Sequence, residues 1–106
     1  MVDSKTIEDF RDRVIQAYRP LKIVLFGSYA LGTVTADSDV DILIILPFEG
    51  KNAQKSAEIL KRIDPRFPID LLVRTPEQVQ ERLEKGDFFI KEILETGKVL
   101  YETTNP

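Results

Sequence analysis

The sequence contains no cysteine and no histidine among its 106 residues. Without cysteine the chain cannot form a disulfide, present a thiolate nucleophile or build a cysteine zinc site, and the cytoplasm is the default compartment. Without histidine it cannot use Ser-His-Asp or Cys-His machinery. Carboxylates are therefore the obvious proton acceptors.

Long apolar runs and a strong charge of one sign are also missing. No segment approaches the roughly 18 apolar residues of a membrane span, and the first five residues do not resemble a signal peptide. The 15 Lys and Arg are scattered among 18 Asp and Glu, which gives a net charge of −3. Proteins that grip a nucleic-acid backbone usually show a basic patch. We therefore expect neither membrane association nor stable nucleic-acid binding by the chain alone.

The composition that remains is that of an ordinary globular protein, with 42% hydrophobic and 31% charged residues. A chain of this length can bury roughly two-thirds of its unfolded surface in a single core. It contains no repeat, low-complexity tract or internal linker. We therefore expect one domain over residues 1–106.

Apolar spacing and turn residues predict the order of the helices and strands. We expect helices over 4–18, 27–31, 52–63, 75–86 and 87–96, strands over 21–26, 40–46, 69–73 and 98–101, and fraying over 102–106. Strand 40–46 is apolar on both faces after Asp41, which is typical of a central strand. In helix 87–96 we expect Phe89, Ile90, Ile93 and Leu94 to face inward. The pattern predicts an α/β (α+β) fold, a small mixed sheet flanked by helices.

A glycine–serine pair follows the first predicted strand and forms a candidate phosphate site. Gly27 allows close approach of the backbone, and Ser28 caps the brief helix that follows. Free amides at such a turn bind anions, above all phosphates. Gly27 and Gly32 have the spacing of a Walker A loop, but Thr33-Val34 follow where that motif needs Lys and then Ser or Thr. A Walker A loop is therefore excluded.

Two aspartates stand two positions apart at the start of the second predicted strand. In a strand, Asp39 and Asp41 share one face with Cα atoms roughly 6.5–7 Å apart, so that both can reach a pair of metal ions about 3.5–4 Å apart. Asp41 lies within an apolar strand, where a charge must be paired or bound to a metal. An EF-hand loop counted from Asp37 is excluded, because Ile42 and Phe48 occupy its sixth and twelfth positions.

Asp70 is a third carboxylate within an apolar strand. If strands 40–46 and 69–73 are neighbours, three carboxylates converge, and each pair at 4 Å repels by about 4 kcal/mol at an effective dielectric of 20. Such a cluster favours divalent cations. The alternatives are turn hydrogen bonds for residues 37–39 and an ion pair for Asp70. Arg74 shares the face of Asp70 and would either meet a phosphate or be a solvated strand end.

Gly27-Ser28, ten intervening residues and Asp39-Val40-Asp41 resemble the signature of the DNA polymerase β-type nucleotidyltransferase superfamily. The short length and the ending Gly97-Lys98-Val99-Leu100-Tyr101-Glu102 resemble its minimal members, the MNT proteins. The resemblance implies the polymerase β-like nucleotidyltransferase fold. It covers nearly the whole chain.

The resemblance also implies roles for five residues. Gly27 and Ser28 would hold the triphosphate of ATP. Asp39 and Asp41 would ligate two Mg²⁺ ions. Asp70 would ligate the catalytic metal and help to deprotonate the attacking hydroxyl.

By the same resemblance, the protein is a Mg²⁺-dependent nucleotidyltransferase that moves AMP from ATP to a hydroxyl, such as a tyrosine of a helical HEPN toxin, and acts as an antitoxin. A partner chain or a second subunit is expected to supply the acceptor surface. Leu31 departs from the family pattern, since many relatives carry arginine before the second glycine. The alternative is a binding module that neutralises its partner by contact alone.

Overall fold

The structure is a computed structural model that describes residues 1–103, and these residues form five helices and four strands. The elements are α1 (Ser4–Tyr18), β1 (Lys22–Phe26), α2 (Ser28–Leu31), β2 (Val40–Ile45), α3 (Asn52–Ile63), β3 (Ile69–Arg74), α4 (Pro76–Glu84), α5 (Phe88–Thr96) and β4 (Lys98–Glu102). Each predicted element is confirmed, with small differences at the ends. Within these residues, no helix has both the length and the apolar character required to cross a bilayer.

The C-terminal segment is the first place where prediction and structure differ. Glu102 lies in β4, and the backbone amide of Thr103 donates to the carbonyl of Leu21 at 2.9 Å. The prediction that fraying begins at Glu102 is therefore wrong, because this backbone continues the pairing with β1. Residues 104–106 lie outside the described part of the chain.

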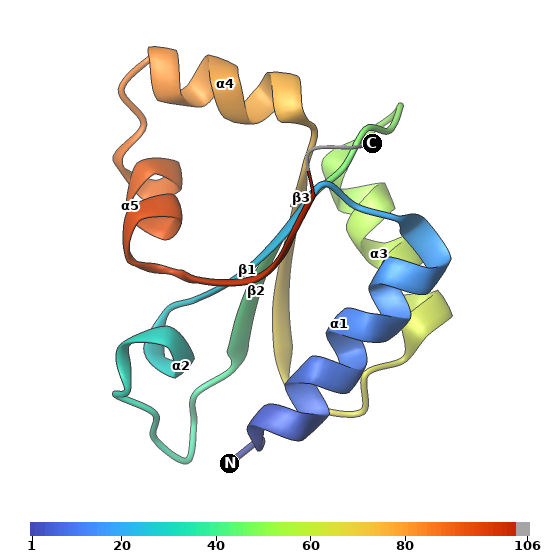
Figure 1. Ribbon diagram of the computed structural model, residues 1–106, viewed down its shortest axis with the longest axis vertical. Coiled ribbons are helices and arrows are strands. Elements are labelled where there is room, and N and C mark those ends of the chain that lie inside the picture. Colours follow the sequence, from blue (N-terminus) through green and yellow to red (C-terminus); the bar gives the residue numbers. More distant parts are fainter. Residues whose placement is uncertain (104–106) are drawn as a thin grey trace.

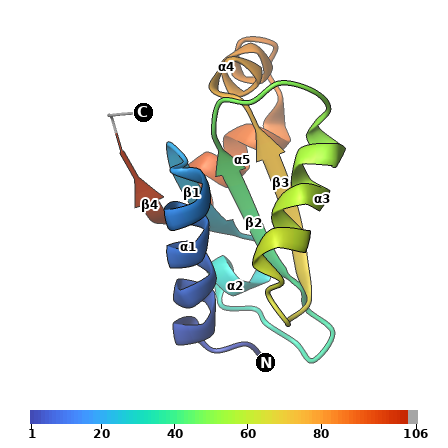
Figure 2. The same ribbon diagram turned by 90° about the vertical axis from the view of Figure 1, so that its right-hand side faces the viewer.

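The four strands form one mixed sheet in the order β3-β2-β1-β4 (Figure 2). β1 pairs antiparallel with β2 and with β4, and β2 pairs parallel with β3. β2 is an inner strand as predicted, and all of its side chains except that of Asp41 are buried. Because of these directions, the end of β1 and the starts of β2 and β3 meet at one edge of the sheet.

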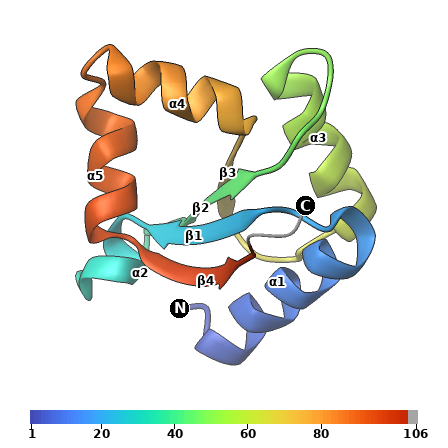
Figure 3. The same ribbon diagram turned by 45° about the horizontal axis from the view of Figure 1, so that its top comes forward.

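Helices cover both faces of this sheet. α1 and α3 lie on one face, and α4 and α5 lie on the other (Figures 1 and 3). The side chains of β2 alternate between the two layers: Ile42 and Ile44 pack in the α1/α3 core, whereas Leu43 and Ile45 pack in the α4/α5 core. Asp41, two residues before Leu43, faces the α4/α5 layer by the same alternation.

Two helix boundaries show how local sequence sets the elements. Thr75 and Gln78 form a capping box at the start of α4, with each side chain bonded to the other residue's backbone amide. Gly97 follows α5 as predicted, but its φ of −72° is not left-handed. Glycine is needed there for space. A Cβ would lie 2.4 Å from the Ile93 carbonyl oxygen and 2.5 Å from Val24 Cγ1.

We expect Gly97→Ala to lower the free energy of unfolding by about 1–3 kcal/mol, the usual cost of overpacking. Urea unfolding of the purified chain measures the change. Gly86→Asn is the control, because Gly86 has a φ of +76° and open space around it, and asparagine tolerates that conformation. It should change stability by less than about 0.5 kcal/mol. A neutral Gly97→Ala would show that α5 does not pack tightly on β1.

Candidate active site

The turn after β1 depends on a glycine at position 27. Gly27 has φ 69° and ψ −150°, a conformation that essentially only glycine adopts. Its carbonyl accepts the amides of Ala30 and Leu31 at 3.1 Å each, which starts α2 directly after the strand. Ser28 is the first residue of this helix and is half-buried. The first amides of a helix have no partner within it, so this turn can offer N–H groups to an anion.

The same glycine also makes room for a carboxylate. A Cβ on Gly27 would lie 2.1 Å from Asp41 Oδ2, so the Asp41 carboxylate packs directly against the glycine backbone. The two residues meet because Phe26, at the end of β1, pairs with Asp41, at the start of β2. The sequence predicts that Gly27 allows the backbone to approach a bound phosphate. The structure adds the contact with Asp41, which only the strand register reveals.

The sheet brings Asp41 and Asp70 side by side. Asp41 is the register partner of Asp70 in the parallel pair β2/β3, so both carboxylates emerge on the α4/α5 face. Asp39 is exposed and lies one residue before β2. The pKa of the Asp41 carboxyl is raised, first by burial and then by the charges of Asp70 and Asp39. The charges of Asp70 and Asp39 therefore both act on the Asp41 carboxyl.

The predicted alternative for Asp70, an ion pair with an arginine or lysine, is not found in the described part of the chain. None of Asp39, Asp41 and Asp70 forms an ion pair there. Within residues 1–103, the charged groups that shift the pKa of Asp41 are the carboxylates of Asp70 and Asp39, and both raise it. The site therefore has an excess of negative charge that no described residue compensates.

The carboxylates of Asp41 and Asp70 fit a magnesium ion whose remaining ligands come from water and a substrate. Within residues 1–103, no group of three or more acidic side chains forms a ready-made metal cage. Mg²⁺ is usually held by one or two carboxylates together with water and substrate phosphates rather than by an all-protein cage. Asp41 and Asp70 supply two such oxygen ligands on one face. The turn at Gly27, the candidate phosphate site, lies directly beside Asp41.

A cavity of about 320 Å³ opens over these aspartates, and we call it the aspartate cavity. It is lined by Phe26, Gly27, Leu31, Asp41, Asp70, Phe89, Glu92, Ile93 and Thr96. Asp39 and Ser28 are not among the lining residues. Leu31, at the position of the expected family arginine, is 60% exposed.

Sequence reasoning missed the α5 wall of this cavity and placed Phe89 wrongly. Phe89 is 53% exposed and packs edge-on against Phe26, with ring centroids 6.0 Å apart. The inward set of α5 begins at Ile90 instead. Phe89 precedes Ile90 directly, and apolar spacing alone does not show where the buried face of a helix ends.

Comparisons with known proteins agree on the family. Residues 7–98 match the family model described as "Nucleotidyltransferase domain". The protein named "Putative protein adenylyltransferase MJ0604" of Methanocaldococcus jannaschii is 33% identical over 105 residues, and the match covers 95% of this chain and all of that protein.

Solved structures share the fold. A crystal structure described as "a putative nucleotidyltransferase from Sulfolobus solfataricus" matches with a TM-score of 0.65 at 17% identity, over 95% of this chain and 81% of that chain. A toxin–antitoxin crystal structure with AMP-PNP gives a TM-score of 0.57 at 21% identity, over 92% of this chain and 74% of that one. A mutant of the toxin–antitoxin MntA–HpeT gives 0.55 at 19% identity, with the same coverage. The predicted polymerase β-like nucleotidyltransferase fold is confirmed.

The raised pKa of Asp41 predicts how the stability of the protein depends on pH. Folding raises the pKa of Asp41, so the stability linked to its protonated form is fully present below the unfolded pKa of about 4 and is lost as pH rises through the folded value. Asp41→Asn removes this loss. In EDTA, we expect the variant to be more stable than wild type at pH 7, with the advantage shrinking toward pH 3.5.

Urea unfolding at both pH values measures this difference. Asp64→Asn is a matched control, because Asp64 is an exposed aspartate that pairs with Arg66 at 2.7 Å outside the aspartate cavity. It should gain no stability at pH 7. An Asp41→Asn variant that is less stable than wild type at pH 7 would contradict the repulsive cluster.

Proposed function

The chain belongs to the nucleotidyltransferase domain family, and from that premise we propose that it is a Mg²⁺-dependent enzyme that transfers AMP from ATP to a hydroxyl group. The observation that carries this proposal is the register pairing of Asp41 with Asp70 directly beside Gly27. It joins a metal-binding carboxylate pair to a phosphate turn. ATP chemistry needs both in one place.

Each residue of the site has a role in this reaction. The amides of the Gly27-Ser28 turn would hold the triphosphate, and Asp39 and Asp41 would ligate the metal ions that accompany it. Bound Mg²⁺ supplies neutralisation of the phosphate charge and lowers the pKa of the attacking hydroxyl. Asp70 would accept the hydroxyl proton as that oxygen bonds to the α-phosphorus and the bond to the β-phosphate oxygen breaks. Pyrophosphate then leaves.

We propose a protein hydroxyl as the acceptor, a tyrosine of a HEPN-type helical toxin, and an antitoxin role for this chain. The name of the Methanocaldococcus jannaschii relative, a protein adenylyltransferase, supports a protein acceptor. Two structures with the same fold come from toxin–antitoxin systems, one of them with AMP-PNP. We further propose that residues 1–106 form one domain that works in the cytoplasm, with the partner or a second copy completing the acceptor site.

A second candidate function is neutralisation of the partner by binding alone. It is favoured by Leu31, an exposed apolar side chain on the rim of the aspartate cavity where many relatives carry arginine. An apolar rim suits contact with another protein surface. This candidate requires no nucleotide binding, so the two functions separate experimentally.

MgATP is expected to raise the Tm of the wild-type chain, whereas ATP with EDTA is not. At about 100 times its Kd a ligand adds about 2.7 kcal/mol, which corresponds to a shift on the order of 10 °C for a domain of this size. Asp41→Asn is expected to lose this shift, and Asp39→Asn to lose most of it, because both remove ligands of the nucleotide-bound metal.

Differential scanning fluorimetry provides the measurement. Lys61→Gln is the control, since Lys61 is an exposed residue of α3 on the opposite face of the sheet. It should keep the full shift. If the wild type shows no Mg²⁺-dependent gain, the nucleotide site is absent and the binding-only function is preferred.

Asp70→Asn is expected to separate binding from chemistry. Asp70 belongs to β3 and completes only the catalytic metal site, so the variant should keep MgATP affinity within a few-fold. Transfer should fall by on the order of 10²–10⁴, the range for losing a positioned base. Calorimetry with MgATP and single-turnover transfer of labelled AMP measure the two effects, with Asp64→Asn as the matched control. Near wild-type transfer by Asp70→Asn would rule out its assignment as the base.

A further inference from the structure

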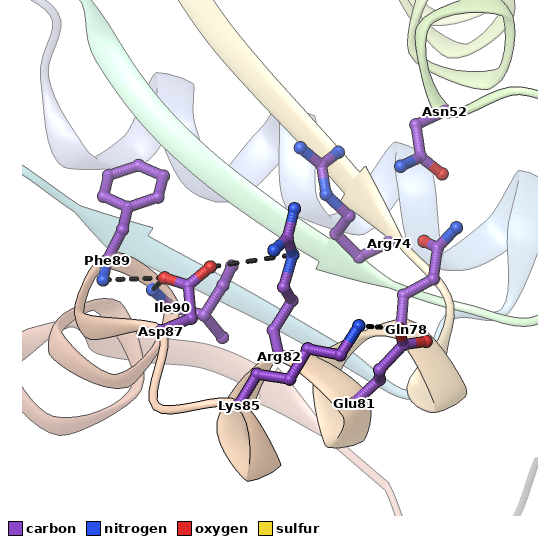
Figure 4. A pocket seen from close by; sticks show the side chains of 9 residues that line it. All are labelled: Asn52, Arg74, Gln78, Glu81, Arg82, Lys85, Asp87, Phe89 and Ile90. Carbon is purple, nitrogen blue, oxygen red and sulfur yellow. Dashed lines mark hydrogen bonds and ion pairs between the residues drawn. The ribbon is translucent and has the colours of Figure 1, made fainter.

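A second cavity adjoins the first on the α4/α5 face of the sheet. It has a volume of about 470 Å³ and is lined by Asn52, Arg74, Gln78, Glu81, Arg82, Lys85, Asp87, Phe89 and Ile90 (Figure 4). We call it the basic cavity. Phe89 lines both cavities, so they are neighbours with this ring as a common wall.

The basic cavity contains three cations and two carboxylates. Lys85 pairs with Glu81 at 2.7 Å and Arg82 with Asp87 at 3.7 Å. The side chains of Lys85, Glu81 and Arg82 are all more than 60% exposed, so these pairs bind weakly and leave room for a competing ligand. The cavity therefore carries one net positive charge in a chain whose net charge is −3.

Arg74 is the cation without a carboxylate partner. It is half-buried at the end of β3, and within residues 1–103 the one hydrogen bond of its guanidinium is the donation from Nη1 to the Val73 carbonyl at 2.8 Å. Among the described residues it forms no ion pair. Figure 4 shows its guanidinium in the hollow between α4 and the start of α3. A partly desolvated guanidinium with free N–H groups favours a carboxylate or phosphate ligand.

The triphosphate of ATP cannot be that ligand if it is held as proposed. Asp70 and Arg74 are four residues apart on one face of β3, which places their Cα atoms about 13 Å apart. The triphosphate would lie at the Asp70 end, against Gly27 and the metal ligands. The rest of ATP is uncharged. The other substrate of the proposed reaction, the acceptor, is a second source of an anion for Arg74.

We propose that the basic cavity binds an aspartate or glutamate of the acceptor polypeptide, about four residues from the hydroxyl that receives AMP. This inference rests on the proposed function. In extended chain, four residues span the same 13 Å or so that separate Asp70 from Arg74. An apolar acceptor residue between the two would cover Phe89, which is 53% exposed between the cavities.

The charge balance favours a polypeptide over a nucleic acid. A nucleic-acid backbone brings one charge per nucleotide and is bound by an extended basic surface. Here Glu81 and Asp87 lie within the cavity itself, and Glu92 lies in the neighbouring aspartate cavity. A single carboxylate matches one net positive charge. A polyanion would meet these acids.

The test uses fluorescein-labelled eleven-residue peptides with a central tyrosine and glutamates four positions to either side. A matched peptide carries glutamine at both positions, and a third carries the glutamates two positions from the tyrosine. Fluorescence anisotropy without nucleotide measures binding to wild type, Arg74→Gln and the control Lys61→Gln. Lys61→Gln removes the same charge from the opposite face of the sheet.

Wild type and Lys61→Gln should bind the first peptide about 10- to 100-fold more tightly than the glutamine peptide, the fold-change for a hydrogen bond to a charged group. Arg74→Gln should lose this preference and keep its MgATP-induced Tm shift. Equal binding of the three peptides by wild type would overturn the inference. So would Arg74-dependent displacement of the first peptide by an eleven-nucleotide single strand, which would favour nucleic acid.

The peptide experiment and the MgATP experiment can fail independently, so the acceptor inference and the proposed function are tested separately. A wild type that is stabilised by MgATP but shows no peptide preference refutes the acceptor inference and leaves the nucleotidyltransferase proposal intact. A wild type without MgATP stabilisation contradicts the proposed function. The peptide preference is measured without nucleotide, so it tests the basic cavity independently.

Discussion

The parallel register between β2 and β3 is the constraint on which the site depends. It places two like charges, Asp41 and Asp70, opposite each other at the starts of adjacent strands. Side chains alternate along a strand, so a slip of one residue would send Asp70 to the opposite face, into the α1/α3 layer. The apolar residues that follow both aspartates hold the register, because a slip would also remove Leu71 and Val73 from the α1/α3 core. Burial of these residues thus stabilises an arrangement that electrostatics alone would oppose.

On the α4/α5 face of the sheet, one cavity carries negative charge and the other carries a net positive charge. Negative groups lie where β2 and β3 start, and positive groups lie at the end of β3 and at the end of α4. β3 carries a residue of each kind, Asp70 and Arg74, on the same face. A substrate lying along β3 would therefore meet opposite charges at its two ends, which sets the direction in which it binds. Phe89, contributed by α5, lies between these two regions.

Much of the fold could be predicted because its signals are local. Apolar periodicity and turn residues located the strands and the helices, and the observed bounds differ only at the ends. The packing of Phe89 could not be predicted, since apolar spacing does not distinguish a residue in the core from one in the wall of a cavity beside it. The basic cavity was missed for a related reason. Arg74 and Arg82 lie on different elements, and only the tertiary fold brings them to one hollow.

The site showed the same limit. Sequence spacing singled out Asp39 and Asp41, but the pairing of Asp41 with Asp70 depended on strand order, which the sequence left conditional. The fold places Gly27, Asp41 and Asp70 around one cavity. The catalytic roles of the aspartates and the phosphate-binding role of the turn stay predictions. Their family was recognisable because glycine–serine and the aspartates keep a fixed spacing across a short loop.

The contact between Gly27 and Asp41 constrains the two positions unequally. With Asp41 present, any side chain at position 27 would collide with its carboxylate, so Gly27 cannot be replaced first. Replacing Asp41 by a smaller residue removes that collision, but the φ of 69° and ψ of −150° still disfavour every residue except glycine. Copies of this fold that lose their activity should therefore lose the aspartate first and retain the glycine. In such a chain a retained glycine indicates only that the turn keeps its conformation. A retained aspartate would indicate that the catalytic activity is kept.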